Sequence, residues 1–397
     1  MAVVGTFADP IPCFTIDLAK PPCERYLEVA QAFKPHLFLL KEFAKRLLAQ
    51  YIPYKWLRKL VTGVSKLFLR RVYDKDESEE IRGIAKAADV PLCFLVALNN
   101  ILECITGNTS GAVPTLLSRG RWLESDNTAP RRLLHFRTLE CAVQELRDLL
   151  VVLQFVDSSS DDPSRIIAQS ITYAGFVGSL TAVRRYECSR KQLYWHQLMV
   201  LLGKRKSVGS MIRSSVLPSS HSNGKTVDTR HCCSQFVRQT MKLSSTASVP
   251  CYLTLCNGLG TAVIVKDHAT GCVHFTKDDI VQQNHDPDLG RGNTIYIQTN
   301  SQRDPEQEIG IPRGHKVPLD RVRNLLERWD QLEYVTSWLN SRAETEMTGL
   351  EMESDHMERV LQARLSEYPM FNERTSFVCI LDPDRGRICW VMRGPQD

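Results

Sequence analysis

The feature that most constrains the fold of this chain is a change in the spacing of its apolar residues. Between residues 24 and 72 they recur at helical intervals, and Pro35 and Pro53 are expected to divide the region into separate helices. Residues 76–88 and the apolar run 92–105 predict two more helices, after which Gly107 and its neighbours predict a turn. The first part of the chain is therefore expected to be helical.

Beyond this point, the pattern changes to short β-branched runs separated by Gly, Pro, Asn and Asp. Strands are expected at 14–18, 133–140, 146–156, 165–182 (a pair), 252–255, 260–266, 294–299, 375–381 and 387–391, with a loop at 114–132. Helices are expected at 318–338 and 349–365. Groups of strands and helices in this order indicate an α+β fold in layers, with mostly antiparallel sheets.

Composition excludes several classes of protein. Hydrophobic residues make up 43% and charged residues 24% of 397 residues, which is typical of a globular protein. The net charge of +5 and the lack of a zinc pattern or a Lys/Arg block argue against nucleic acid as a partner. The 13 cysteines include no C-x-x-C pair, so buried thiols in a reducing compartment are expected rather than zinc or disulfides.

The N-terminal part of the chain is basic. Residues 1–72 contain 12 Lys/Arg and 5 Asp/Glu, with Tyr54 and Trp56 among them. Such a region fits either a solvated helix face that covers the core or peripheral contact with an anionic membrane through residues 24–72. No signal peptide and no apolar run of membrane-spanning length are evident, so a cytoplasmic protein is expected rather than one of a lysosome-like compartment.

Six local strings together resemble one enzyme family. They are FTIDLAKPPCERY, IRGIAKAADVPL, LLHFRTLE, ITYAGFVGSLTAVR, IYIQTN and FNERTSFVCILDP, in chain order from about residue 11 to residue 393. Together they resemble the acid ceramidase and N-acylethanolamine acid amidase family. The segment GNTSG at 107–111 is most similar to the G-C-T-S-G turn of the fungal-type members.

The resemblance implies an N-terminal-nucleophile hydrolase with a four-layer αββα fold. Members of this family cut themselves before a cysteine, whose thiolate then attacks the substrate amide while its free α-amine acts as the base. Residues 1–107 would form the N-terminal α-segment, and residues 108–397 the β-segment that contains the hydrolase site. The family mechanism uses no metal and no organic cofactor, so none is expected.

The resemblance also places the family's site residues on this chain. The nucleophile falls on Asn108, and Arg137 matches an arginine that could orient it or hold a polar substrate group. Glu140 stands where the family has an aspartate that steers the α-amine, and Asn300 matches the oxyanion donor. Arg313 lies at about the spacing of a second site arginine.

Asn108 makes activity the open question, because a carboxamide nitrogen is not a nucleophile toward an amide carbonyl. The chain is then either a pseudoenzyme or an enzyme whose nucleophile has moved to Thr109, with Ser110 and the upstream Cys104 less favoured. An asparagine at position 108 could also result from a sequencing or gene-model error, or from a deliberate change that blocks self-cleavage. Cleavage between Asn108 and Thr109 would expose Thr109 as the N-terminal nucleophile, but the register would move by one residue and the side chain would point elsewhere.

The leading expectation is a hydrolase of lipid amides, with ceramide or an N-acylethanolamine as substrate and a fatty acid and an amine as products. One alternative is a catalytically inactive lipid-binding or regulatory homologue. Another is an amidase that acts on a non-lipid amide.

Overall fold

The computed structural model of the chain describes several stretches, which together form the body of the protein. They are residues 10–114, 133–141, 143–183, 199–217, 232–248, 251–257, 260–266, 271–275, 296–299, 350–368, 370–383 and 385–395. The predicted helix 318–338 and the predicted loop 114–132, apart from its first residue, lie outside these stretches.

The N-terminal part is helical, as the apolar spacing predicts. Its elements are β1 (Cys13–Asp17), η1 (Pro22–Glu24), α1 (Leu27–Ala32), α2 (Lys34–Tyr51), α3 (Lys55–Phe68), α4 (Lys75–Ala88) and α5 (Leu92–Ile105). Pro35 occupies the first turn of α2, where no intrahelical N–H is needed, and Pro53 lies between α2 and α3. Asp74 caps α4 by accepting hydrogen bonds from the backbone N–H groups of Asp76 and Glu77. Both prolines therefore divide the region as predicted.

Three sheets follow, and almost all of their strand pairs are antiparallel. Their strands are β2 (Thr106–Pro114), β3 (Leu133–Cys141), β4 (Leu150–Val156), β5 (Ala168–Tyr173), β6 (Thr181–Val183), β7 (Cys251–Cys256), β8 (Thr261–Lys266), β9 (Gly271–Phe275), β10 (Tyr296–Thr299), β11 (Thr375–Asp382) and β12 (Arg387–Arg393). The first sheet has the order β1-β4-β5-β6, the second β10-β2-β3-β11-β12 and the third β7-β8-β9. Among the described strands, only β1 and β4 run parallel. The prediction of mostly antiparallel sheets is confirmed.

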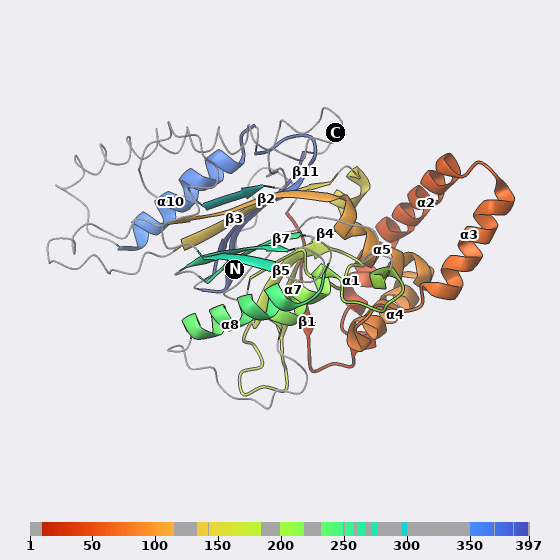
Figure 1. Cartoon of the computed structure of the whole chain (residues 1–397), viewed down its shortest axis with the longest axis horizontal. Coiled ribbons are helices and arrows are strands. Elements are labelled where there is room, and N and C mark those ends of the chain that lie inside the picture. The colour runs from red at the N-terminus through yellow and green to blue at the C-terminus, as the bar shows by residue number, and fades with distance from the viewer. Residues whose placement is uncertain are drawn as a thin grey trace.

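The sheets and helices form four layers. The helix α10 (Leu350–Leu365) lies on one side of the second sheet, and α7 (Val208–Val216) and α8 (Cys232–Ser245) lie on the far side of the other two sheets (Figure 1). One apolar cluster joins Leu361 and Leu365 of α10 to Phe136 of β3, whereas the main core joins Leu139 of the same strand to Ile171 of β5. Since alternate residues of β3 enter different cores, the second sheet is covered on both faces. This helix–sheet–sheet–helix order confirms the predicted α+β arrangement.

A buried charge cluster attaches the N-terminal helices to this layered body. Glu80 of α4 has no solvent exposure, and both of its oxygens accept hydrogen bonds from the Arg213 guanidinium of α7, at 2.5 and 2.7 Å. Arg25, just after η1, adds a third bond to Glu80 at 3.0 Å. Arg213 also donates to the Val177 carbonyl, in the turn before β6. Because a buried carboxylate without its partners is costly, these contacts fix α4 against α7.

Several elements differ from the expectations; the 3-10 helix η3 (Gln144–Leu149), for example, occupies the start of the predicted strand 146–156, and β4 begins only at Leu150. The helix α8 and the strand β9 were not predicted from the sequence, although β9 completes an antiparallel meander with β7 and β8. Within the described residues, no helix combines the length and the apolar character that a membrane span requires. Cys141, Cys256 and Cys379 are buried thiols that take no part in a disulfide.

Candidate functional site

The segment around Asn108 is a strand and not the predicted turn. Helix α5 ends at Ile105 and β2 begins at the next residue, so no loop separates them. Asn108 pairs with Leu139 of β3, and Thr109 pairs with Thr138 of β3 and with Thr299 of β10. The turn prediction was wrong because β2 pairs with a strand on each side, and this pairing outweighs the local turn preference of Gly and Asn.

Arg137 is the predicted site residue that the structure describes most fully. It lies on β3 between β2 and β11, where it pairs with Ser110 on one side and Cys379 on the other. Its side chain is buried, and Nη1 donates a hydrogen bond to the Leu180 carbonyl just before β6. The guanidinium thus reaches from the second sheet toward the first, where this hydrogen bond anchors it.

A serine–histidine pair beside Arg137 was not identified as a pair from the sequence. The Ser110 Oγ and the His135 Nε2 atoms share a hydrogen bond of 2.6 Å, and both residues are buried. Burial lowers the pKa of His135 to about 3, with the nearby charge of Arg137 acting in the same direction. His135 is therefore neutral near neutral pH. Ser110 and His135 come from neighbouring antiparallel strands, a proximity that only a correct strand pairing would have revealed.

Strand alternation decides which positions share the face of Arg137. Leu139 belongs to the core between the sheets, whereas Phe136 belongs to the cluster under α10. Residues paired directly across antiparallel strands share a face, so Ser110 lies on the inter-sheet face with Arg137. Position 108 is two positions from Ser110, and position 109 is one position from it. The register therefore puts position 108, and not position 109, on the face of the sheet that carries Arg137.

Glu140 lies beside the family cleavage position but not on the face of Arg137. It pairs with Gly107 in the register of β2 and β3. Because Arg137 and Glu140 are three positions apart on β3, strand alternation puts them on opposite faces. The Glu140 Oε1 atom accepts a hydrogen bond of 3.4 Å from the Asn372 side chain, which precedes β11. A role of Glu140 in steering an α-amine at position 108 remains a prediction.

The other predicted residues are only partly located. Asn300 and Arg313 lie outside the described residues, although Thr299, which precedes Asn300, pairs with Thr109 of β2. Cys104 lies in the last turn of α5. In the part of the chain that the structure describes, no cluster of His, Cys, Asp and Glu is arranged to hold a metal ion.

Comparisons with known proteins show what this chain is similar to. Residues 9–73 match a family model described as the beta subunit of N-acylethanolamine-hydrolyzing acid amidase. The acid ceramidase of Heterocephalus glaber is 24% identical over 193 residues, which cover 45% of this chain and 44% of that protein. The acid ceramidase of Balaenoptera acutorostrata scammoni is 26% identical over 239 residues, which cover 57% of this chain and 58% of that protein. The chain thus spans about half the length of the curated relatives it matches.

Among solved structures, the Caenorhabditis elegans ortholog of N-acylethanolamine-hydrolyzing acid amidase aligns with 72% of this chain and 100% of its own, at 14% identity and a TM-score of 0.43. That score is too low to establish a shared fold, so the layer order rests on the sheets and helices themselves. Residues 9–73 contain the first of the six strings, FTIDLAKPPCERY, and the curated relatives point to the same family. The chain is therefore similar in sequence to acid ceramidases and, over residues 9–73, to the beta subunit of N-acylethanolamine-hydrolyzing acid amidase.

Proposed function

We propose that this protein hydrolyses the amide bond of a lipid, of the ceramide or N-acylethanolamine class, to a fatty acid and an amine. The observation that carries the proposal is the pairing of β2 with β3, in which Arg137 lies opposite Ser110 and two residues along from the family nucleophile position. A buried guanidinium with fixed donors is suited to hold the polar part of an amide substrate or to orient a nucleophile. Contact with the lipid phase through residues 24–72 belongs to the same proposal.

The substitution at position 108 favours a second candidate function. Asn108 offers no thiolate, and a carboxamide nitrogen is too weakly basic to attack an amide carbonyl. A chain with this residue would keep the lipid site and lose self-cleavage and turnover. The second candidate is therefore a lipid-binding or regulatory homologue without catalysis.

Thr109 is a weaker replacement for the missing nucleophile than its hydroxyl alone suggests. Strand alternation puts position 109 on the face of β2 that is turned toward the layer of α10, away from the face of Arg137. Cleavage after Asn108 would have to be followed by a one-residue shift of the strand to change this. We therefore expect Thr109→Ala to leave any hydrolysis of lipid amides unchanged.

The two candidates are separated by the mass of the purified chain. Self-cleavage yields residues 1–107 and 108–397 as separate fragments under denaturing conditions, whereas the inactive homologue stays a single chain of 45.1 kDa at acidic and neutral pH. Hydrolysis is followed with a fatty-acid ceramide and a fatty-acid ethanolamide. Turnover by the unaltered chain supports the hydrolase, and lipid binding without turnover supports the inactive homologue.

Asn108→Cys tests whether the rest of the site is intact. Restoring the family nucleophile should restore self-cleavage and hydrolysis if Arg137 and its neighbours still form a working site. Asn108→Ala is the matched control, and it should show neither self-cleavage nor hydrolysis of either lipid. If Asn108→Cys stays uncut and inactive toward both lipids while it folds like the unaltered chain, the proposal of an inherited hydrolase site is wrong.

A further inference from the structure

The layer between the first and second sheets contains a buried hydroxyl that the fold does not use. Thr181, the first residue of β6, is 1% exposed, and its Oγ1 atom has no hydrogen-bond partner among the described residues. A buried hydroxyl without a partner lowers the stability of a protein, and such groups are uncommon in folded chains. Where one of them lies next to a candidate site, a ligand is a natural partner for it.

Strand pairing turns Thr181 toward the second sheet. Thr181 pairs with Ile171 of β5, and residues paired directly across antiparallel strands share a face. On this face of β5, the hydroxyls of Tyr173 and Ser376 of β11 share a hydrogen bond of 2.8 Å, and the Gln169 side chain accepts a hydrogen bond from the backbone of β12. The side chain of Thr181 therefore lies on the face of the first sheet that covers the second.

The candidate site residues face the same layer from the other side. Arg137 reaches it from β3 and donates a hydrogen bond to the carbonyl of Leu180, the residue before Thr181. Ser110 and, by strand alternation, position 108 lie on the face of the second sheet that carries Arg137. A substrate amide that reaches position 108 would therefore lie in the layer that Thr181 faces.

Thr181 offers a kind of hydrogen bond that Arg137 does not. A guanidinium only donates hydrogen bonds, whereas a threonine hydroxyl also accepts them. Arg137 is thus suited to the carbonyl oxygen of an amide, and Thr181 is suited to a group that donates. Ceramides and N-acylethanolamines share such a donor, a hydroxyl on the second carbon from the amide nitrogen.

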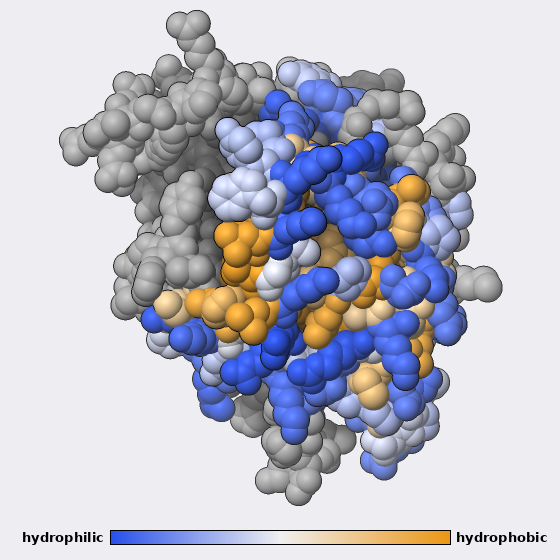
Figure 2. Space-filling model, turned by 90° about the vertical axis from the view of Figure 1, so that its right-hand side faces the viewer, coloured by the Kyte–Doolittle hydropathy of each residue, from blue (hydrophilic) through white to orange (hydrophobic). Residues whose placement is uncertain are grey.

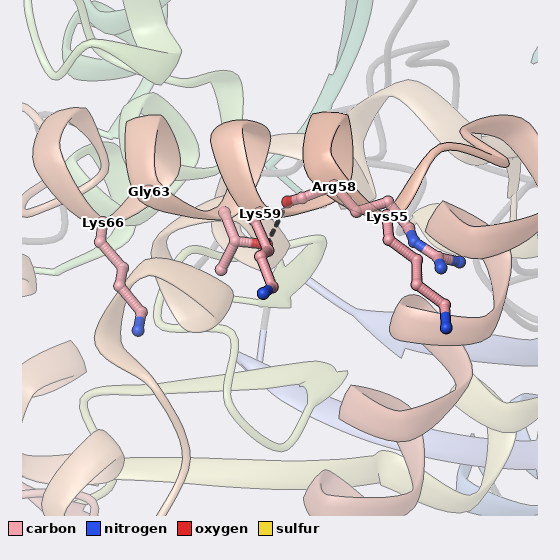
Figure 3. Close-up of a pocket in the computed structure, with 6 residues that line it drawn as sticks. Lys55, Arg58, Lys59, Gly63 and Lys66 are labelled. Carbon is pink, nitrogen blue, oxygen red and sulfur yellow. Dashed lines mark hydrogen bonds between the residues drawn. The ribbon is translucent and has the colours of Figure 1, made fainter.

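The exposed groove on α3 does not match the chemistry of these headgroups. The groove is lined by four cations, a threonine and a glycine, namely Lys55, Arg58, Lys59, Lys66, Thr62 and Gly63 (Figure 3). The surface on this side of the molecule alternates between hydrophilic and hydrophobic patches (Figure 2). The headgroups are neutral, and a neutral hydroxyl gains most from a hydrogen bond that is shielded from water. The buried layer is therefore the better place for their recognition.

We propose that Thr181 determines the headgroup specificity of this site by accepting a hydrogen bond from the hydroxyl beside the substrate amide. The inference rests on the proposed function and names the part of the substrate that the site recognises. A site with a buried group of this kind discriminates against an analogue that lacks the hydroxyl, because the group then stays unpaired. The bound substrate supplies the partner that Thr181 does not find among the described residues.

The test compares two ligands on the full chain, decanoyl ethanolamide and N-propyldecanamide, in which a methyl group replaces the hydroxyl. Titration calorimetry gives the two dissociation constants, and kcat/KM replaces them if the chain hydrolyses the ligands. The unaltered chain should prefer the ethanolamide by about tenfold, which is the effect of one hydrogen bond. Thr181→Val should remove most of this preference by weakening the binding of the ethanolamide but not that of the propylamide.

Thr172→Val is the matched control. The Thr172 hydroxyl is also buried and has no partner in the described part of the chain, but alternation along β5 turns it away from the second sheet. Both variants should raise the urea midpoint of unfolding, because each replaces an unpaired buried hydroxyl with a methyl group. Only Thr181→Val should change the ligand preference, and a loss of binding that accompanies a gain in stability does not come from a damaged fold.

Several results would overturn the inference. Equal binding of the two ligands by the unaltered chain, or a preference that survives Thr181→Val, would assign the hydroxyl to an internal water molecule instead. A lower urea midpoint for Thr181→Val would show that the hydroxyl serves the fold, and a preference that Thr172→Val also removes would show that the effect is not local. If the unaltered chain binds and hydrolyses neither ligand, the proposed function fails and the inference with it. If the chain binds both ligands and Thr181→Val changes neither, the inference alone fails.

Discussion

Glu77 is expected to make this protein less stable as the pH rises from acid to neutral. Glu77 is a residue of α4 whose carboxyl is buried, and burial raises the pKa of this carboxyl from 4.5 to about 7. The charges of Asp74 and Glu80 add to this rise. Arg213 and the hydroxyl of Ser210 oppose it without cancelling it. Arg213 makes its hydrogen bonds to Glu80 rather than to Glu77. The guanidinium therefore compensates the charge of Glu80 more than that of Glu77.

The sign and size of the effect follow from proton linkage. Between pH 4.5 and about 7 the folded protein keeps the Glu77 proton and the unfolded chain loses it, so the free energy of unfolding falls as the pH rises. The stabilisation by Glu77 is fully present below pH 4.5 and is lost above about pH 7. At 1.36 kcal/mol for each pKa unit, the loss amounts to about 3 kcal/mol.

Glu77→Gln replaces the protonated acid with a neutral group of similar shape. The variant should match the unaltered protein at about pH 4 and exceed its free energy of unfolding by up to about 3 kcal/mol at about pH 8. Urea unfolding at a series of pH values measures both proteins, and all other groups cancel in the difference. Glu79→Gln, which removes an exposed carboxylate that pairs with Arg82 on the same helix, is the control and should show no such trend. A difference between Glu77→Gln and the unaltered protein that does not change with pH would refute the reasoning.

Three further predictions concern stability and are read from urea unfolding curves at one pH. Asp74→Ala removes the cap of α4 and should cost about 1 kcal/mol; no loss would mean that the helix end finds other partners. Gly83→Ala would bring a Cβ to 2.0 Å from a backbone oxygen of η1 and should cost about 1–3 kcal/mol. Gly63→Ala meets nothing within 4 Å and should gain up to about 1 kcal/mol, so similar effects at the two glycines would contradict the crowding argument. Ser110→Ala removes the buried hydrogen bond with His135 and should cost about 1–3 kcal/mol, and a neutral result would show that the two atoms are not coupled.

The N-terminal helices could be predicted because their boundaries are encoded locally. Pro35 and Pro53 act through their own missing N–H groups, and Asp74 caps α4 with its own side chain. Asp89 ends α4 in the left-handed region, with φ of 58°, and Pro91 follows it. None of these effects depends on a distant residue.

The parts that were missed depend on long-range pairing. The segment 107–109 has the composition of a turn, and it is a strand only because β3 and β10 lie on its two sides. Similarly, Arg213 and Glu80 are 133 residues apart in sequence, and nothing in either neighbourhood marks them as partners. Of the candidate site, Arg137 and Asn108 stay predictions that come from the family resemblance, whereas the Ser110–His135 pair became visible only with the strand register.

The direct passage from α5 into β2 has a consequence for how processing of this chain would be detected. If the chain were cut between Gly107 and Asn108, Thr106 and Gly107 would still be paired with Cys141 and Glu140 of β3. The buried bonds of Glu80 with Arg213 would add a second attachment that does not involve the severed peptide. The two pieces would therefore migrate as one particle in any native separation. A cut chain and an intact chain would differ only once the sheet has been unfolded.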